Sequence, residues 1–203
     1  MNLKKLVTAA VCTMLMAAVA FTAGCGGEKK SDKKVLKVGM ECAYAPYNWS
    51  QTKADGGAVK IAGSNEYAYG YDVMMAKKLA DSMGADLEIH KIEWDGLAPA
   101  VVSGKIDAAI AGMSITSKRK ETVDFTKPYY YATVVALVKK DSEQAKAQSV
   151  ADLKGSVATS QLNTIWYDQI DQVPDVKKLP AIDTVPGMIV ALTSGKCNLI
   201  VTD

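Results

Sequence analysis

The stretch Gly104–Tyr131, GKIDAAIAGMSITSKRKETVDFTKPYYY, decides how the rest of the chain is interpreted. Its apolar run Ile106–Ala111 predicts a short buried parallel strand. The run ends at Gly112, and the charged segment that follows predicts a helical turn with Ser117 as its N-cap. Hydroxyls, free backbone groups and the guanidinium of Arg119 are therefore expected just past the carboxyl end of a strand, where open α/β sheets bind ligands.

The residues alone leave two interpretations of Arg119 open. An arginine at a strand end can hold a carboxylate with two parallel hydrogen bonds. Most exposed arginines, however, are solvated side chains on surface turns.

The segment Gly112–Tyr130, GMSITSKRKETVDFTKPYY, resembles the signature of the family 3 extracellular solute-binding proteins, which are receptors of polar amino-acid ABC importers. A looser resemblance extends from Val35 to the last residue. It implies an α/β, two-lobed fold of the periplasmic-binding-protein type II, with lobe 1 over residues 35–131 and lobe 2 over residues 132–203. In that family the arginine after the S-x-T segment, here Arg119, holds the α-carboxylate of the ligand.

The composition excludes several other classes of protein. The chain has 203 residues, of which 49% are hydrophobic, so it can bury a core and is not a disordered chain. Lys4 and Lys5 account for the net charge of +2, and the neutral remainder argues against a nucleic-acid partner. His90 is the only histidine and no Cys-x-x-Cys motif occurs, so neither a zinc site nor another cofactor is expected.

The N-terminal residues Met1–Gly24 predict a secretory signal with a basic start and an apolar run over Leu6–Phe21. The small residues before Cys25 resemble a bacterial lipobox, although Thr22 stands where such signals prefer Leu. This resemblance implies that Cys25 becomes lipidated and anchors the protein to the outer face of the membrane or in the periplasm. An ordinary cleaved signal or an uncleaved anchor stays open. The polar residues 25–34 predict a flexible tether.

Periodicity and turn residues predict the remaining elements. We expect strands over 35–40, 87–92, 156–160 and 197–201, helices over 72–83, 97–102, 165–170 and 184–193, and a turn-rich insertion over 50–65. The β run over 129–138 is expected to cross from one lobe to the other, because ten extended residues span roughly 33 Å. The distant cysteines Cys42 and Cys197 are expected to be buried free thiols, with a disulfide left open.

An internal echo links the two halves of the chain. Leu97–Gly112 reads LAPAVVSGKIDAAIAG, and Met188–Asp203 reads MIVALTSGKCNLIVTD. Both are a helix, then Ser-Gly-Lys, then a short β run, so Gly112 and Asp203 fall at equivalent strand ends. The echo predicts two similar lobes that present strand ends to a shared cleft, although helix–glycine–strand units are common in α/β folds.

The family resemblance implies how an amino acid would be held by its charges. Arg119, with backbone N–H groups near Thr164, takes the carboxylate. Asp203, with Ser114 and the carbonyl group of Gly112, takes the ammonium. Without the resemblance, Thr164 would be interpreted as a plain N-cap and Asp203 as an exposed carboxylate.

The resemblance also implies contacts for the side chain of the ligand. Tyr44 and Trp94 sandwich it, and Glu41 contacts its far end. Asn163 stands where the family commonly has a small residue, which affects how closely the backbone can approach. On the residues alone, Tyr44 and Trp94 are equally well interpreted as core rings.

These observations predict a binding receptor that captures a free polar or cationic L-amino acid and delivers it to ABC permease subunits. No nucleophile elbow, P-loop or dinucleotide fingerprint is present, and a Ser-His-Asp triad would have to use His90. A cyclohexadienyl-type dehydratase, with Glu41 as proton donor, and a sensor domain are alternatives on the same fold. Family members continue beyond the counterpart of Asp203, so the resemblance implies a chain truncated within lobe 2, which lacks the return crossing, is less stable than a complete member and binds weakly or not at all.

Overall fold

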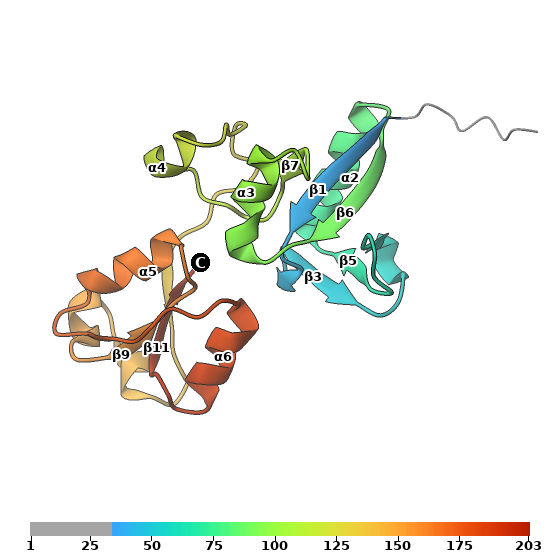
Figure 1. Ribbon diagram of the computed structural model, residues 1–203. Coiled ribbons are helices and arrows are strands. Elements are labelled where there is room, and N and C mark those ends of the chain that lie inside the picture. The colour runs from blue at the N-terminus through green and yellow to red at the C-terminus, as the bar shows by residue number, and fades with distance from the viewer. Residues whose placement is uncertain (1–33) are drawn as a thin grey trace, which may run out of the picture. The chain divides into compact units, whose positions relative to one another are not determined.

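A three-stranded parallel sheet in the order β6–β1–β7 forms the centre of the first lobe (Figure 1). The computed structural model describes residues 34–203. Strand β1 (Val35–Met40) pairs along its whole length with β6 (Asp86–Lys91) and, at Val38 and Gly39, with β7 (Ala108–Ala109). The predicted first strand is confirmed to the residue, because its apolar side chains have a core to fill.

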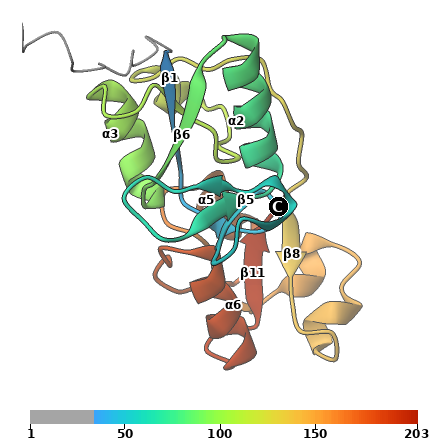
Figure 2. The same ribbon diagram turned by 90° about the vertical axis from the view of Figure 1, so that its right-hand side faces the viewer.

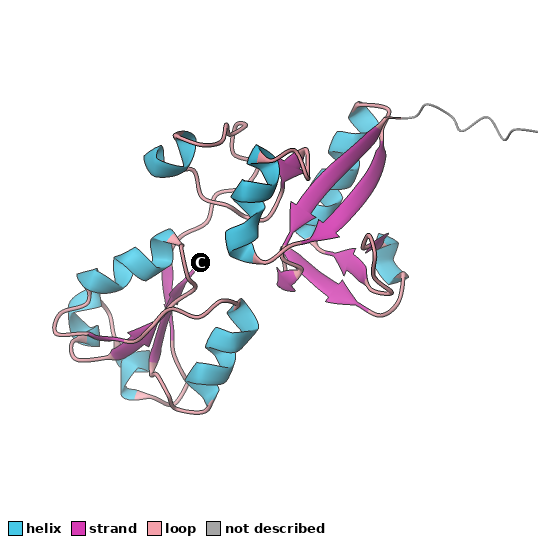
Figure 3. Ribbon diagram, viewed as in Figure 1, coloured by secondary structure: helices cyan, strands magenta, loops and turns pink. Residues whose placement is uncertain are grey.

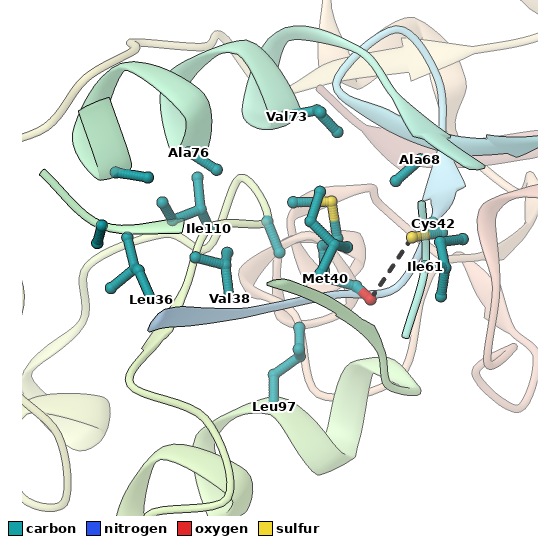
Figure 4. Packing of buried hydrophobic residues seen from close by; sticks show 14 residues of the cluster. Leu36, Val38, Met40, Cys42, Ile61, Ala68, Val73, Ala76, Leu97 and Ile110 are labelled. Atoms are coloured by element: carbon teal, nitrogen blue, oxygen red, sulfur yellow. Dashed lines mark hydrogen bonds between the residues drawn. The ribbon is translucent and has the colours of Figure 1, made fainter. Parts of the chain in front are cut away.

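Helices cover both faces of this sheet. Figure 4 shows Val73 and Ala76 of α2 (Tyr71–Ser82) on one side of β1, and Leu97 of α3 (Leu97–Val102) on the other. Val38 on β1 is fully buried. Burial alternates over the first half of β1 and is continuous from Val38 to Met40, where both faces of the sheet are covered.

A second, antiparallel sheet in the order β2–β3–β5–β4 adjoins the first. Its strands are Ala43–Tyr44 (β2), Asn48–Gln51 (β3), Val59–Lys60 (β4) and Tyr67–Tyr69 (β5), and a short 3-10 helix, η1, spans Asp55–Gly57. The sequence predicted only a turn-rich insertion here. These strands are two to four residues long and half exposed, so they leave no periodic pattern.

The second lobe is built on a four-stranded sheet in the order β10–β9–β11–β8. Its strands are Val135–Leu137 (β8), Val157–Thr159 (β9), Lys177–Lys178 (β10) and Leu199–Thr202 (β11). Strand β8 runs antiparallel to β11, beside which it lies in Figure 2, and the other pairs are parallel. Helices α5 (Ile165–Gln169) and α6 (Val185–Thr193) pack on this sheet.

The remaining helices are short. They are the 3-10 helices η2 (Trp94–Gly96), η3 (Glu143–Lys146), η4 (Val150–Leu153) and η5 (Ile170–Gln172), and the α-helix α4 (Ser117–Lys120). In the part of the chain that the structure describes, none of the helices combines the length and the apolar character needed to cross a membrane.

The internal echo is a real repeat of local structure. Helix α3 leads through Gly104 to β7, and helix α6 leads through Gly195 to β11. Both glycines have a positive φ, 71° at Gly104 and 79° at Gly195, which only glycine adopts readily. Each strand then pairs in parallel with a strand of its own lobe.

Three expectations about local structure were wrong. The predicted strand 106–111 contains ladder pairing only at Ala108–Ala109, and the predicted crossing strand 129–138 only at Val135–Leu137 (Figure 3). In the second case β-forming residues lack a neighbouring strand until β8 reaches β11. The N-cap of α4 is Thr116, not Ser117, because the Thr116 hydroxyl accepts the backbone N–H of Arg119.

Cys42 and Cys197 are both buried free thiols, as expected. Burial raises the pKa of the Cys42 thiol to about 12, so it stays protonated at neutral pH. The predicted signal, Cys25 and the tether up to residue 33 lie outside the described residues, and the boundary between residues 131 and 132 stays a prediction.

A matched pair of valines tests the core of the first lobe. Val38→Ala removes two buried methyl-sized groups from a fully buried side chain and should cost roughly 2 kcal/mol of unfolding free energy. Val102→Ala, at a side chain that is 64% exposed, should change it by less than about 0.5 kcal/mol. Urea unfolding followed by far-UV circular dichroism measures both, and equal losses would contradict the described core.

Candidate functional site

The loop after β1 carries Glu41 and Tyr44 and is anchored on the start of α2. The backbone N–H of Asp72 donates to the carbonyl oxygen of Tyr47 at 2.8 Å, and that of Tyr71 donates to Pro46 at 3.2 Å. These two helix-end N–H groups would otherwise lack partners. The loop is thereby held at the carboxyl end of β1, with its side chains free to reach the second lobe.

Tyr44 is a buried ring that contacts the end of β11. Its ring centroid lies 4.8 Å from that of Tyr47 and 5.8 Å from that of Trp166. Its hydroxyl donates to Oδ1 of Asp203, the residue that follows β11. Burial, and then the neighbouring Asp203 carboxylate, raise the pKa of Tyr44 far above its usual value, so the hydroxyl keeps its proton.

A cavity of about 250 Å³ lies against this contact. Its lining includes four of the predicted site residues, together with Ile165 of α5: Tyr44, Gly112, Ser114 and Asp203. At Gly112, φ is 63° and an added Cβ would lie 3.3 Å from the Tyr44 ring. A side chain there would therefore be strained and would crowd the ring that reaches Asp203.

The guanidinium of Arg119 is held by carbonyl oxygens from both lobes. It donates to the carbonyl oxygen of Ser114 at 2.6 Å and to that of Asn163 at 2.8 Å. Its central carbon lies 5.4 Å from the centroid of the Trp94 ring, within the range of a cation–π contact. Burial lowers the pKa of Arg119, although an arginine stays charged in proteins.

Asn163 joins the lobes by a second bond. Its side-chain amide donates to Oδ1 of Asp95 at 2.9 Å. Its φ is 55°, a conformation that asparagine tolerates better than most residues, and this conformation turns its carbonyl group toward Arg119. Thr164, the next residue, is the N-cap of α5, as its hydroxyl accepts the N–H of Tyr167 at 3.3 Å.

Glu41 forms a third contact between the lobes, with a residue that the sequence analysis did not single out. Its Oε2 accepts from Nε2 of Gln161 at 2.9 Å, and Gln161 also donates to the carbonyl oxygen of Asp183 at 2.9 Å. Glu41 is only 6% exposed, and its Oε1 has no hydrogen-bond partner among the described residues. Burial raises the pKa of Glu41, the bond from Gln161 opposes the rise, and Glu93 adds to it. The sequence feature that could have identified Gln161 is its place as a polar residue just past strand β9.

The nine predicted residues therefore fall into three groups that share contacts. The first group is the four residues that line the cavity. The second group is Trp94 and Asn163, both of which contact Arg119 directly. Arg119 joins the two groups, because it also donates to the carbonyl oxygen of Ser114 in the first group. Glu41 and Thr164 form the third group, because the Thr164 hydroxyl donates to the carbonyl oxygen of Gln161 at 2.7 Å. Arg119 itself is not one of the described residues that line the 250 Å³ cavity.

This arrangement places the guanidinium of Arg119 over the Trp94 ring and the carboxylate of Asp203 at the Tyr44 hydroxyl, while the carboxylate of Glu41 is bonded to Gln161. Such a set can pair both charges of a zwitterion, since each buried charge needs an opposite charge or hydrogen bonds. Among residues 34–203, no group of three or more His, Cys, Asp or Glu side chains could hold a metal ion.

Sequence comparison identifies related proteins of known type. The model of the bacterial extracellular solute-binding proteins, family 3, matches residues 36–185. The ABC transporter arginine-binding protein 1 of Escherichia coli K12 is 30% identical over 202 residues, which are 99% of this chain and 72% of that protein.

Solved structures of the same kind are similar in fold. The arginine-bound form of truncated ArgBP from T. maritima has a TM-score of 0.69 and 29% identity, over 83% of this chain and 73% of that one. An ancestral amino acid-binding protein, AncCDT-1, described as a precursor of cyclohexadienyl dehydratase, has a TM-score of 0.70 and 32% identity, over 83% of this chain and 70% of that one.

The buried Glu41 carboxyl should leave a mark on the pH dependence of stability. Its folded pKa lies above the unfolded value near 4.5, so folding favours the protonated form. That contribution is complete below about pH 4.5 and is lost as the pH rises through the folded pKa. Glu41→Gln, which cannot ionise, should therefore gain stability relative to the wild type as the pH rises from 4 toward 8.

Urea unfolding at several pH values measures this difference. Glu143→Gln is the matched control, since the Glu143 side chain is 85% exposed. A difference between Glu41→Gln and the wild type that stays constant over this pH range would contradict the described burial of Glu41.

Proposed function

Because the chain belongs to the bacterial extracellular solute-binding proteins of family 3, we propose that it is an extracytoplasmic receptor that binds a free L-amino acid and delivers it to an ABC transporter permease. The observation that carries this proposal is the guanidinium of Arg119, held by Ser114 and Asn163 beside a cavity that Asp203 lines. A cation and a carboxylate close to one cavity match the two charges of an amino acid.

The proposed carboxylate site is Arg119. An arginine has five N–H donors, and two of the Arg119 nitrogens are fixed by carbonyl groups, which leaves donors for a ligand carboxylate. The N–H groups at the start of α5, after Thr164, are the proposed partners from the second lobe. Carbonyl oxygens hold the guanidinium in place without neutralising its charge.

The proposed ammonium site is Asp203 with Ser114 and the carbonyl group of Gly112. All three residues line the 250 Å³ cavity. The Tyr44 hydroxyl donates a hydrogen bond to Oδ1 of Asp203, and Oδ2 is available to accept one from an ammonium group. Burying the ligand's charges is then tolerable, since each is paired.

The side chain of the ligand is proposed to be cationic. Oε1 of Glu41 is buried without a partner among the described residues, which is costly until a hydrogen-bond donor reaches it. A guanidinium or ammonium supplies both the donor and the opposite charge, and a neutral amide supplies only the donor. The Trp94 ring already accepts one guanidinium on its face. The Escherichia coli relative is named for binding arginine, and the T. maritima protein is in its arginine-bound form.

Ligand contacts from both lobes explain how binding would be signalled. A ligand that touches Arg119 and Asp203 favours the arrangement in which the lobes are joined, because it binds that arrangement best. The joined form is then what a permease could recognise.

One similar structure supports a second candidate function, that of a dehydratase. AncCDT-1 is described as a precursor of a dehydratase, and a dehydratase needs a proton donor. Burial raises the pKa of Glu41, so this carboxyl is the donor that the alternative would use.

A thermal-shift screen of the twenty amino acids tests the receptor. L-Arginine at millimolar concentration should raise the melting temperature, because a ligand that binds only the folded state stabilises it. Agmatine, which lacks the carboxylate, should not. Arg119→Ala should lose about 2–5 kcal/mol of affinity for L-arginine, as one partner of a buried charge pair is removed.

Lys118→Ala, at the exposed neighbour of Arg119, is the control and should bind as the wild type does. A loss below tenfold for Arg119→Ala would remove the carboxylate role. Turnover of prephenate or arogenate without any shift by an amino acid would support the dehydratase instead.

We also propose that a lipid on Cys25 anchors the protein to the membrane. The support is the small-residue run that ends at this cysteine. The wild type should fractionate with membranes, and Cys25→Ser should be released into the soluble fraction of the envelope or the medium. Cys12→Ser is the matched control, and membrane retention of Cys25→Ser equal to that of the wild type would refute the anchor.

A further inference from the structure

We propose that Asp72 is a positioning residue of the site. Its buried carboxylate ties the loop that carries Glu41 to the strand end at Gly112, through Asn48 and Tyr129. The proposal rests on the proposed function, since positioning matters only if these two segments bind a ligand.

The carboxylate of Asp72 is the centre of a buried hydrogen-bond network. Asp72 lies in the first turn of α2 and is fully buried. Its Oδ2 accepts from Nδ2 of Asn48 at 2.7 Å, and its Oδ1 accepts from the hydroxyl of Tyr129 at 2.7 Å. Both short bonds help to offset the cost of burying the charge.

One arm of the network fixes the loop after β1. Oδ1 of Asn48, itself fully buried, accepts the backbone N–H of Cys42 at 2.8 Å. Cys42 has a φ of 55°, which is unusual for a residue other than glycine and needs external support. Glu41 directly precedes Cys42, so this bond sets the direction in which Glu41 leaves the sheet.

The other arm fixes the strand end that leads to Ser114 and Arg119. The Tyr129 hydroxyl accepts the backbone N–H of Gly112 at 3.0 Å. Tyr129 lies in the segment that leads from the first lobe to β8 and has no ladder hydrogen bonds there. The Tyr129 side chain therefore holds this segment in place where no strand pairing does. It also attaches the segment that crosses between the lobes to the strand end at Gly112.

The direction of every bond in the network is determined. The N–H groups of Cys42 and Gly112 can only donate, so the Asn48 oxygen and the Tyr129 oxygen accept from them. The Asn48 amide group and the Tyr129 proton must then both point at Asp72, which has to accept at both oxygens. Only a carboxylate does this. An amide at position 72 presents a donor to one of the two arms: facing Asn48 it opposes another donor, and facing Tyr129 it leaves the hydroxyl proton without its acceptor.

Asp72→Asn is therefore a nearly isosteric test. It should weaken L-arginine binding at least tenfold by titration calorimetry, while the far-UV spectrum stays that of the folded protein. Tyr129→Phe should weaken binding several-fold. Because both act through one network, the double variant should be no more than about twofold weaker than Asp72→Asn, whereas independent structural effects would multiply.

Two matched controls lie in the same helix. Asp81→Asn removes an exposed carboxylate of α2, and Tyr71→Phe removes a hydroxyl whose hydrogen bond among residues 34–203 goes to the carbonyl oxygen of Tyr129, at 3.2 Å. Both should bind within twofold of the wild type. Binding of folded Asp72→Asn within twofold of the wild type would overturn the proposal.

Amide hydrogen exchange gives a readout that needs no ligand. Exchange should accelerate at Cys42 or Gly112 in Asp72→Asn, and at Gly112 in Tyr129→Phe, while amides within β1 keep their protection. Unchanged protection at both positions would overturn the positioning role. A wild type that binds no amino acid, but shows these exchange changes in the variants, would refute the proposed function and leave the network standing. If Asp72→Asn does not fold, Tyr129→Phe decides by the same two measurements.

Discussion

The guanidinium of Arg119 is half-buried between two lobes and is held there by one backbone carbonyl oxygen from each, those of Ser114 and Asn163. Backbone carbonyl groups cannot move independently of the fold, so the position of the cation depends on the paths of two loops. Those paths depend on positive φ angles, 63° at Gly112 and 55° at Asn163. In the proposed site this constraint also sets where a ligand carboxylate would lie, because a partly desolvated cation is stabilised by an opposite charge.

The parts of the fold that the sequence predicts are those with dense burial. Strand β1 and helix α3 agree with their predicted bounds to the residue, because apolar side chains mark the faces that β1 and α3 bury. The repeated Ser-Gly-Lys turns are also predictable, since the left-handed conformation at Gly104 and Gly195 is one that glycine adopts most readily. The strands of the small antiparallel sheet and of the crossing segment cannot be predicted from the sequence, because their pairing depends on which distant strand is available.

Buried polar residues mark the limit of prediction within the candidate site. Glu41, Asn48, Asp72 and Gln161 are all less than 7% exposed, yet each is a residue type that is usually solvated. Glu41 and Gln161 are separated by 120 residues, so no local pattern indicates that they meet. The family signature identifies Arg119 and the residues around it, but it carries no information on the partners that orient them.

The contacts that join the lobes need not compete with a ligand. The Tyr44 hydroxyl donates to one carboxylate oxygen of Asp203, and the Gln161 amide donates to one carboxylate oxygen of Glu41. In each case the second oxygen remains for a group that is not part of the protein, and for Glu41 it is buried and has no partner among the described residues. Arg119 likewise uses two donors on carbonyl groups and keeps others. If these residues bind the ligand as we propose, the bonds between the lobes preorganise the atoms that face it, and binding adds hydrogen bonds to groups that are already oriented. Preorganisation of this kind lowers the entropy lost on binding, so in the proposed site the same residues would serve both lobe contact and recognition.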